Sequence, residues 1–363
     1  MEKGFMSLLK KICICSLYFI SVCCHSMSDK ICVNSTTNYK MFGSVRWSDY
    51  LSTSFIMAFR DENFTNFVIK SATSEFQLSQ QVSKTTKDQC PVMLGLFTSQ
   101  DCLITGNKLK KNEIIALSPS CSNENIKRFF PYIYSMTPDQ SSYSKAVADY
   151  LNRKNAEVKI YAFYQPSDIY SRDGYKYIKH FVNKEIISVE VKTNGSFDLK
   201  KFDNLKDKEA YLVFFTYPLP SVQVISKLDA NHLVNKNNVI IGASSWMYQL
   251  SVFYSIKSIL AKANKLLAPN LVDKKRVEGS KFNMDFKNKF HRRPDVVEVL
   301  TYDATRLSVK CYDYAKRYRN FKDGFLKCLH DGVYEGISGD ISFIKGSPFA
   351  HRTIYLDNVM DRL

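Results

Sequence analysis

Two short turns rich in small hydroxyl residues are the parts of this sequence best suited to hold a ligand. Gly95-Leu-Phe-Thr-Ser-Gln-Asp101 follows the apolar run Pro91–Leu94, and Leu117-Ser-Pro-Ser-Cys-Ser-Asn123 ends the run Glu113–Leu117. In a parallel α/β sheet, such turns bring free backbone N–H groups and Ser or Thr hydroxyls to the edge where small ligands bind. The pattern therefore predicts ligand binding and favours it over catalysis.

The same serines also have a purely structural interpretation. Ser99, Ser120 and Ser122 belong to a residue type that caps helix N-termini well without any ligand. No catalytic motif accompanies them, because the sequence has no phosphate loop, and Gly242-Ala-Ser-Ser-Trp246 lacks the second glycine of a nucleophile elbow. The six histidines show no metal-binding spacing. We therefore expect a binding protein that is not an enzyme and needs no cofactor or metal.

The elements that position these turns form a repeating strand–helix rhythm up to about residue 250. The predicted strands are Ile31–Val33, Phe67–Ile69, Pro91–Leu94, Glu113–Leu117, Val158–Phe163, Ile186–Val191, Glu209–Thr216 and Asn238–Gly242. The predicted helices are Trp47–Phe59, Glu75–Lys87, Asp101–Lys110, Tyr143–Leu151, Tyr175–Asn183 and Ser221–Asp229. Since the rhythm occurs before and after about residue 142, it predicts two doubly wound α/β lobes with parallel sheets.

Helices dominate the prediction beyond residue 250. Ser251–Ala268, Gly279–Phe290 and Asp295–Tyr318 are expected to be helical. The tail is expected to close as a β-hairpin at Gly336–Phe343, followed by an extended run at His351–Asn358.

Composition and charge limit the possible partners. The chain has 363 residues, of which 45% are hydrophobic and 13% aromatic, as in a globular protein of two domains. Its net charge is +16, but the basic residues are scattered and lack the interleaved aromatic residues that stack on bases. We therefore expect a lysine-rich surface and no nucleic-acid partner.

Residues 1–26 have the features of an export signal. A basic start precedes the apolar run Ile12–Cys24, which is too short to span a bilayer comfortably, and Ser26 could precede a signal-peptidase cut. A lipid anchor at Cys23 is less favoured, because Val22 stands where a smaller residue is preferred. An uncleaved anchor remains a third alternative. The expected location is periplasmic or otherwise extracytoplasmic.

Removal of residues 1–26 leaves six of the ten cysteines, an even number that suggests disulfides in an exported chain. Cys311 and Cys328 flank a short helix and turn and form the favoured pair. A bond between Cys102 and Cys121 would join the two serine-bearing turns, which leaves Cys32 with Cys90. The sequence alone does not fix this connectivity, and buried free thiols are the alternative.

In its ordered set of turns, the chain resembles the type I periplasmic binding proteins, especially the branched-chain amino-acid-binding branch that serves ABC importers. The marks are Gly95–Ser99, Leu117–Asn123 followed by Phe130–Thr137, Tyr302-Asp-Ala304 and Gly336–Phe343. The resemblance implies two lobes joined by three crossings, with a ligand buried between them. The implied first lobe holds residues 27–142 and 270–332, and the second holds residues 143–269 and 333–363.

The resemblance also implies roles for single residues. Ser99 and the Ser120–Ser122 turn would grip a ligand carboxylate, and Phe42 would cover the side-chain pocket. In the second lobe Tyr170 and Tyr217 would close over the ligand, although both also suit ordinary packing or surface positions.

One departure from the family concerns Ser244. The family's amino-acid binders place an acid near this position to pair with the ligand ammonium, and a serine supplies no charge. The implied ligand is therefore amino-acid-like or a small carboxylate or amide, and an α-amine is not required. The implied partner is an ABC permease, with the protein itself a monomer. A sensor or protein-binding scaffold of the same fold is the alternative function.

Overall fold

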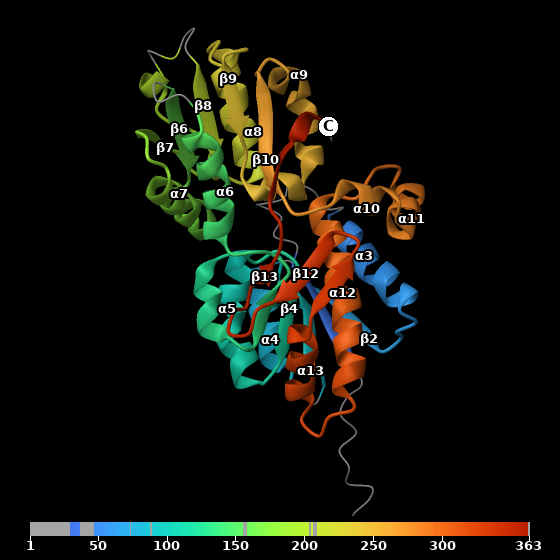
Figure 1. Ribbon diagram of the computed structural model, residues 1–363. Coiled ribbons are helices and arrows are strands. Elements are labelled where there is room, and N and C mark those ends of the chain that lie inside the picture. Colours follow the sequence, from blue (N-terminus) through green and yellow to red (C-terminus); the bar gives the residue numbers. More distant parts are fainter. Residues whose placement is uncertain are drawn as a thin grey trace, which may run out of the picture.

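The computed structural model describes residues 30–36, 47–72, 74–87, 89–154, 158–202, 205 and 209–361. The predicted export signal and Phe42 lie outside the described residues. The described chain forms two α/β lobes, one above the other in Figure 1. This confirms the predicted fold class.

The first lobe is built on a five-stranded parallel sheet in the order β2-β1-β3-β4-β5. Its strands are β1 (Ile31–Thr36), β2 (Phe67–Ala72), β3 (Val92–Gly95), β4 (Ile115–Ser118) and β5 (Ile133–Ser135). Its helices are α3 (Trp47–Asp61), α4 (Glu75–Lys84), α5 (Ser99–Lys111), α12 (Val296–Ala315) and α13 (Phe321–His330), with the 3-10 helix η1 (Glu124–Phe129). Every residue of β3 and β4 is buried, as expected where helices cover both faces of a parallel sheet.

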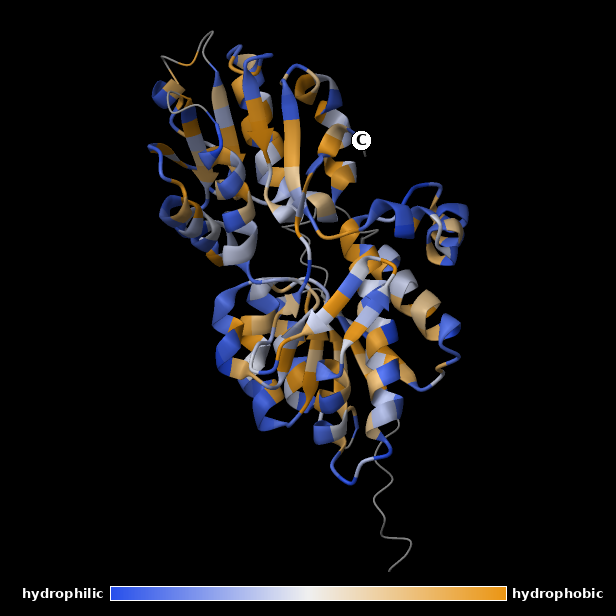
Figure 2. Ribbon diagram, viewed as in Figure 1, coloured by the Kyte–Doolittle hydropathy of each residue, from blue (hydrophilic) through white to orange (hydrophobic). Residues whose placement is uncertain are grey.

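The second lobe is built on a six-stranded sheet in the order β14-β10-β9-β8-β6-β7, in which only β14 runs antiparallel. Its strands are β6 (Lys159–Tyr164), β7 (Ile186–Glu190), β8 (Ala210–Phe214), β9 (Asn238–Ile241), β10 (Lys265–Asn270) and β14 (Tyr355–Asn358). Its helical elements are α6 (Gln140–Asn152), α7 (Ile169–Phe181), η2 (Leu199–Phe202), α8 (Pro218–Ala230), η3 (Ser244–Tyr248), η4 (Leu250–Ile256), α9 (Lys257–Leu260) and η5 (Val359–Asp361). Figure 2 shows the hydrophobic strands inside both lobes and hydrophilic residues on the outer helices.

The predicted helix Ser251–Ala268 is wrong. Only η4 and α9 are helical there, and the end of the run forms β10. Leu266 and Leu267 pair with β9 and are almost fully buried, so sheet pairing outweighs local helical spacing. Helix α7 also begins earlier than predicted, which places Tyr170 in its first turn.

The hairpin β11 (Val333–Gly336) and β12 (Gly339–Phe343), with β13 (Ala350–His351), forms a third small sheet. Ile341 and Phe343 join the hydrophobic core of the first lobe, where the Phe343 ring lies 5.6 Å from that of Tyr134. The segment 333–351 therefore packs with the first lobe, which differs from its predicted place in the second. Only β14 continues into the second sheet.

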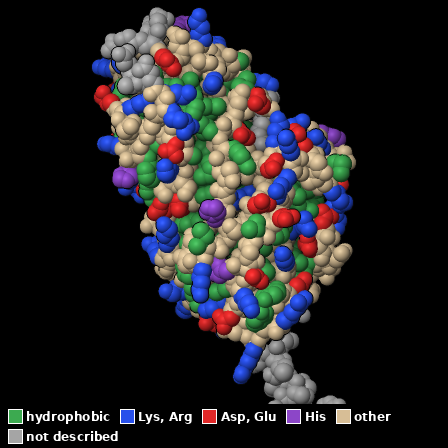
Figure 3. All heavy atoms as spheres, in the orientation of Figure 1, with side chains coloured by type: hydrophobic (Ala, Val, Ile, Leu, Met, Phe, Trp, Pro, Cys, Tyr) green, Lys and Arg blue, Asp and Glu red, His purple; other side chains and the backbone are tan. Residues whose placement is uncertain are grey.

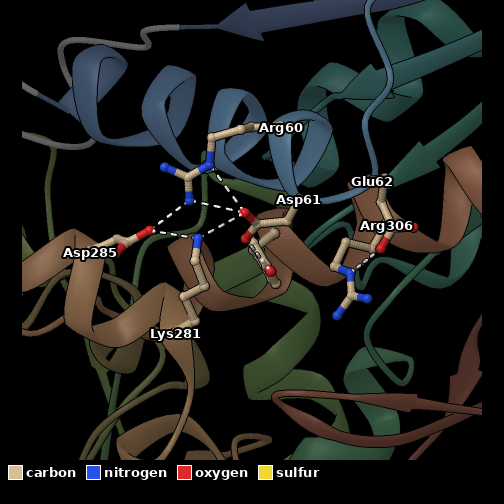
Figure 4. A network of polar contacts seen from close by, with 7 residues as sticks. Arg60, Asp61, Glu62, Lys281, Asp285 and Arg306 are labelled. Carbon is tan, nitrogen blue, oxygen red and sulfur yellow. Dashed lines mark hydrogen bonds and ion pairs between the residues drawn. The ribbon is translucent and has the colours of Figure 1, made fainter.

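Among the described residues, three short segments cross between the lobes: 136–139 after β5, 271–273 after β10 and 352–354 before β14. After the second crossing, α10 (Lys274–Glu278) and α11 (Lys281–Phe290) form an arm beside α3. Figure 4 shows the ion pairs that fasten this arm: Arg60 to Asp285 at 2.6 Å, and Lys281 to Asp61 at 3.1 Å.

All three predicted disulfides are present: Cys32–Cys90, Cys102–Cys121 and Cys311–Cys328. The first joins β1 to the segment before β3, the second joins α5 to the turn after β4, and the third joins α12 to α13. The alternative of buried free thiols is thereby wrong.

Candidate ligand-binding site

The two turns of the first lobe, 95–101 and 117–123, are here named the serine turns. Both follow adjacent strands, so they meet at the same edge of the sheet. Gly95 begins the first turn with a positive φ of 105°, and a Cβ there would lie 1.8 Å from the carbonyl oxygen of Asn34. Only glycine permits this approach of the turn to β1.

None of the predicted serines is a helix cap. Helix α5 is capped by Thr98, whose hydroxyl accepts a hydrogen bond from Asp101 N at 3.0 Å, while Thr98 N donates to the Asp101 carboxylate. Asn123 caps η1. The serines instead occupy positions inside the turns, which removes the capping interpretation.

Ser99 and Ser120 join the two serine turns to each other. The Ser99 hydroxyl accepts from Asn123 N at 3.2 Å, and the Ser120 hydroxyl donates to the Phe97 carbonyl at 2.6 Å. Ser122 is also buried, and its carbonyl accepts from Gln140 N at the start of α6. The disulfide between Cys102 and Cys121 adds a covalent link at the same place.

In the second lobe the structure brings together Tyr170, Tyr217 and Ser244, which lie far apart in the sequence. The two rings stack with centroids 5.1 Å apart. The Tyr170 hydroxyl lies 3.0 Å from Ser244 Oγ and accepts a hydrogen bond from Ser245 N at 3.3 Å. All four residues are buried. Strand ends and helix starts position them, since Tyr217 directly precedes α8 and Ser244 begins η3.

Two further tyrosines, Tyr143 of α6 and Tyr248 of η3, complete what we name the tyrosine cluster. Their phenol groups lie within electrostatic reach of each other, and that of Tyr248 also lies within reach of Ser244, while the Tyr143 hydroxyl has no hydrogen-bond partner among the described residues. Burial raises the pKa of all four phenols, so they stay protonated and able to donate hydrogen bonds. The sequence prediction missed this pair, although Tyr248 lies at the end of the same short helix, η3, that begins at the predicted Ser244.

The serine turns and the tyrosine cluster face each other across the lobe boundary. Asn123 of the second serine turn donates from Nδ2 to the Asp173 carboxylate of α7 at 2.9 Å. Beside this bond, Tyr177 of α7 interacts with Glu124 of the first lobe. The Tyr217 hydroxyl also lies within electrostatic reach of Asp101. The lobes are thus in contact at the site.

The acidic side chains at this boundary are already engaged. Asp101 takes part in the cap of α5, and Asp173 accepts from Asn123. Asp168 caps α7, and burial raises its pKa above the ordinary value. At Ser244 the chain carries a neutral hydroxyl bonded to Tyr170. The Ser120 hydroxyl is used within the turn, whereas Ser99 accepts a hydrogen bond and Tyr143 has no partner within the described chain, so both can donate. The arrangement is suited to a ligand that accepts hydrogen bonds from hydroxyls and phenols.

Lys and Arg side chains are spread over the face seen in Figure 3 and are mixed with Asp and Glu. Within the described ranges, no group of three or more His, Cys, Asp or Glu could hold a metal ion. No helix of the described residues is long and apolar enough to cross a membrane.

These features define a two-lobed ligand-binding protein of the type I periplasmic binding fold. The family model described as "Receptor family ligand binding region" matches residues 60–349, so the chain belongs to that family. No curated protein sequence matches it.

Solved structures share the fold at low sequence identity. The branched-chain amino acid transporter substrate-binding protein LivJ of Streptococcus pneumoniae, in complex with isoleucine, is 14% identical with a TM-score of 0.73, over 91% of this chain and 97% of that one. The leucine-binding protein LivK of Thermotoga maritima is 12% identical with a TM-score of 0.74, over 90% and 97%. An ABC-transporter solute-binding protein of Rhodopseudomonas palustris, in complex with 3,4-dihydroxybenzoic acid, is 13% identical with a TM-score of 0.73, over 91% and 93%.

Proposed function

We propose that this protein is an extracytoplasmic solute-binding protein that captures a small ligand between its lobes and delivers it to an ABC permease. The observation that carries the proposal is the contact between the second serine turn and α7, the helix that also bears Tyr170 of the tyrosine cluster, across the lobe boundary. Closure of two such lobes buries a small solute and changes the surface offered to a permease. The first 26 residues would direct export and be removed.

The ligand of the proposed function is a small solute that needs no α-ammonium group, such as a carboxylate or an amide. The hydrogen-bond donors at the site support this choice, as does the neutral Ser244. An ammonium buried without a carboxylate would cost several kcal/mol. Structural neighbours of this fold include proteins crystallised with isoleucine and with 3,4-dihydroxybenzoic acid, so both amines and amine-free acids deserve testing.

The test is a thermal-shift and calorimetric screen of residues 27–363 against matched pairs of ligands. Each pair differs only in the amine: leucine with 4-methylpentanoate, phenylalanine with 3-phenylpropionate, and tyrosine with 3-(4-hydroxyphenyl)propionate. A ligand at 100 times its Kd should add about 2.7 kcal/mol of stability. Binding of an amine-free member supports both the capture of a small solute and the proposal that the ligand needs no α-ammonium group.

The screen separates two kinds of failure. Binding of the amino acids alone would retain the solute-binding function but overturn the ligand class. Absence of binding across these pairs and a wider panel of sugars and peptides would overturn solute capture and favour a sensor or scaffold role. Tyr217→Ala provides the matched control, because it removes one stacked ring and should abolish any specific signal.

A further inference from the structure

A single arginine stands where all three interlobe crossings meet. Arg352 belongs to the third crossing, and only 9% of the residue is exposed. Its Nη1 donates to the Met136 carbonyl of the first crossing at 3.2 Å. Its Nη2 lies 3.2 Å from the Leu271 carbonyl of the second crossing. One guanidinium therefore bonds the backbones of both other crossings.

The same guanidinium is tied to the first lobe through the turn of the β11–β12 hairpin. Nη2 lies 2.7 Å from Ser338 Oγ and 3.1 Å from the Ser338 carbonyl. Ser338 N and Ile337 N donate to the Asp303 carboxylate of α12 at 2.8 and 3.0 Å. Asp303 is fully buried, so Ser338 stands between two buried groups of opposite charge.

The hairpin turn reaches the crossings because its glycine leaves room for the acid. A Cβ on Gly336 would lie 2.4 Å from Asp303 Oδ2. The Ser338 carbonyl also accepts from Asp273 N at the end of the second crossing. The two segments singled out in the sequence, Tyr302-Asp-Ala304 and Gly336–Phe343, thus meet at the hinge.

Arg352 also faces the tyrosine cluster. It lies within electrostatic reach of the phenols of Tyr143 and Tyr248, which connect through Ser244 to Tyr170. Besides these two and Asp303, the phenol of Tyr355 on β14 lies in its reach. The hinge guanidinium therefore lies within electrostatic reach of two phenols of the candidate ligand site.

We propose that Arg352 is a positioning residue. By bonding the three crossings to one another it makes them act as a single hinge, and so it sets the angle between the lobes. Hinge motion takes place through changes of φ and ψ in crossing segments. Because the rigid, planar guanidinium bonds several carbonyl groups at once, it forces the crossings to bend together. Without it each crossing can adopt its own angle, and the relative positions of the lobes spread. This proposal holds whichever ligand the protein binds.

The experiment measures the distance between the lobes in the unliganded protein. Spin labels at K110C on α5 and K179C on α7, both exposed, report the distribution of interlobe distances by pulsed electron paramagnetic resonance. We expect Arg352→Met to widen the distribution at least twofold. Arg352→Lys, which keeps the charge but offers a single ammonium, should widen it less.

The matched control is Arg306→Met. Arg306 is a partly buried arginine of α12 that pairs with Glu62 inside the first lobe, as Figure 4 shows, and the contacts described for it include no crossing. Its loss should lower stability and leave the distribution unchanged. An unchanged width in Arg352→Met would overturn the proposal. If that variant does not fold, the same measurement is made on Ser338→Ala and Arg352→Lys. Distance distributions as narrow as that of the wild type in both variants would also overturn the proposal.

Discussion

The serine turns and the tyrosine cluster border the same boundary, but they are held in place by different interactions. In the serine turns, hydroxyls bond to the backbone of their own lobe, as Ser120 does with Phe97. In the tyrosine cluster, side chains bond and stack on one another, as Tyr170 does with Ser244 and Tyr217. The conformation of the serine turns is therefore fixed largely by the backbone, whereas the arrangement of the tyrosine cluster depends on each of its side chains.

The largest effect should come from the tyrosine cluster. Tyr170→Ala removes a buried ring and its stacking partner's contact, and should lower the free energy of unfolding by about 3–5 kcal/mol. Tyr170→Phe keeps the ring and loses the bonds to Ser244 and Ser245, at a cost of about 1 kcal/mol. Urea denaturation followed by circular dichroism measures both. A loss below 1 kcal/mol for Tyr170→Ala would show that the cluster is not packed as described.

The disulfides allow the serine turns to be loosened without touching a serine. Paired Ser substitutions at Cys102 and Cys121 open a loop of sequence separation 19, and those at Cys311 and Cys328 one of 17. Each should cost about 3 kcal/mol by loop entropy. Only the first pair borders the serine turns, since Cys121 lies in the second turn and Cys102 directly follows the first, so only its loss should also weaken binding of whichever ligand the screen yields. Equal ligand affinity in the two double-serine variants would contradict this role of the turns.

Much of the fold was predictable from local pattern, because buried parallel strands appear as short apolar runs. Two strands were missed: β5, which has only three residues, and β10, which owes its strand to pairing with β9 and β14 that no local pattern records. The location of the serine turns was also predictable. Their bonds were not, because Thr98 and Asn123 supply the caps expected of serines.

The hinge could not be predicted from sequence for a different reason. Arg352 bonds to Met136, Leu271 and Ser338, and its role exists only once three distant segments are brought together. An isolated arginine in a tail segment carries no sign of burial. Local spacing therefore identifies elements and turns, whereas contacts at the crossings depend on the completed fold.

Single serine substitutions should have smaller effects, and they should distinguish the serines that stabilise the turns from the serine that contacts the ligand. Ser99→Ala and Ser120→Ala each remove a bond that joins the turns, and each should cost about 1 kcal/mol of stability. Ser122→Ala removes a hydroxyl for which no such bond is described, so stability should be unchanged while ligand affinity falls. Thermal melts and calorimetry separate the two effects. A stability loss at Ser122 equal to that at Ser120 would give it a structural role instead.

The smallest effect should come from a substitution outside the candidate ligand site, in the ion pairs that join α3 to α11. Burial raises the pKa of Asp61, but hydrogen bonds from Tyr302, Lys281 and Arg60 outweigh it, so the folded pKa lies below the ordinary 3.8. The unfolded chain therefore binds the proton more tightly. The stability that this carboxylate contributes is complete above its ordinary pKa and is lost as the pH falls through the folded value.

Since the network of Figure 4 is partly exposed, the contribution of Asp61 should be only about 0.5–1 kcal/mol. Asp61→Asn should flatten the acid limb of the stability–pH curve by that amount and should leave binding at the candidate ligand site unchanged. Unfolding free energies measured between pH 3 and 6, in wild type and variant at two salt concentrations, provide the test. An equal acid slope in both proteins would show that other carboxylates carry the pH dependence. A change in ligand affinity would show that the ion pairs between α3 and α11 influence the candidate ligand site. The α3–α11 ion pairs and the tyrosine cluster could then not be treated as independent regions.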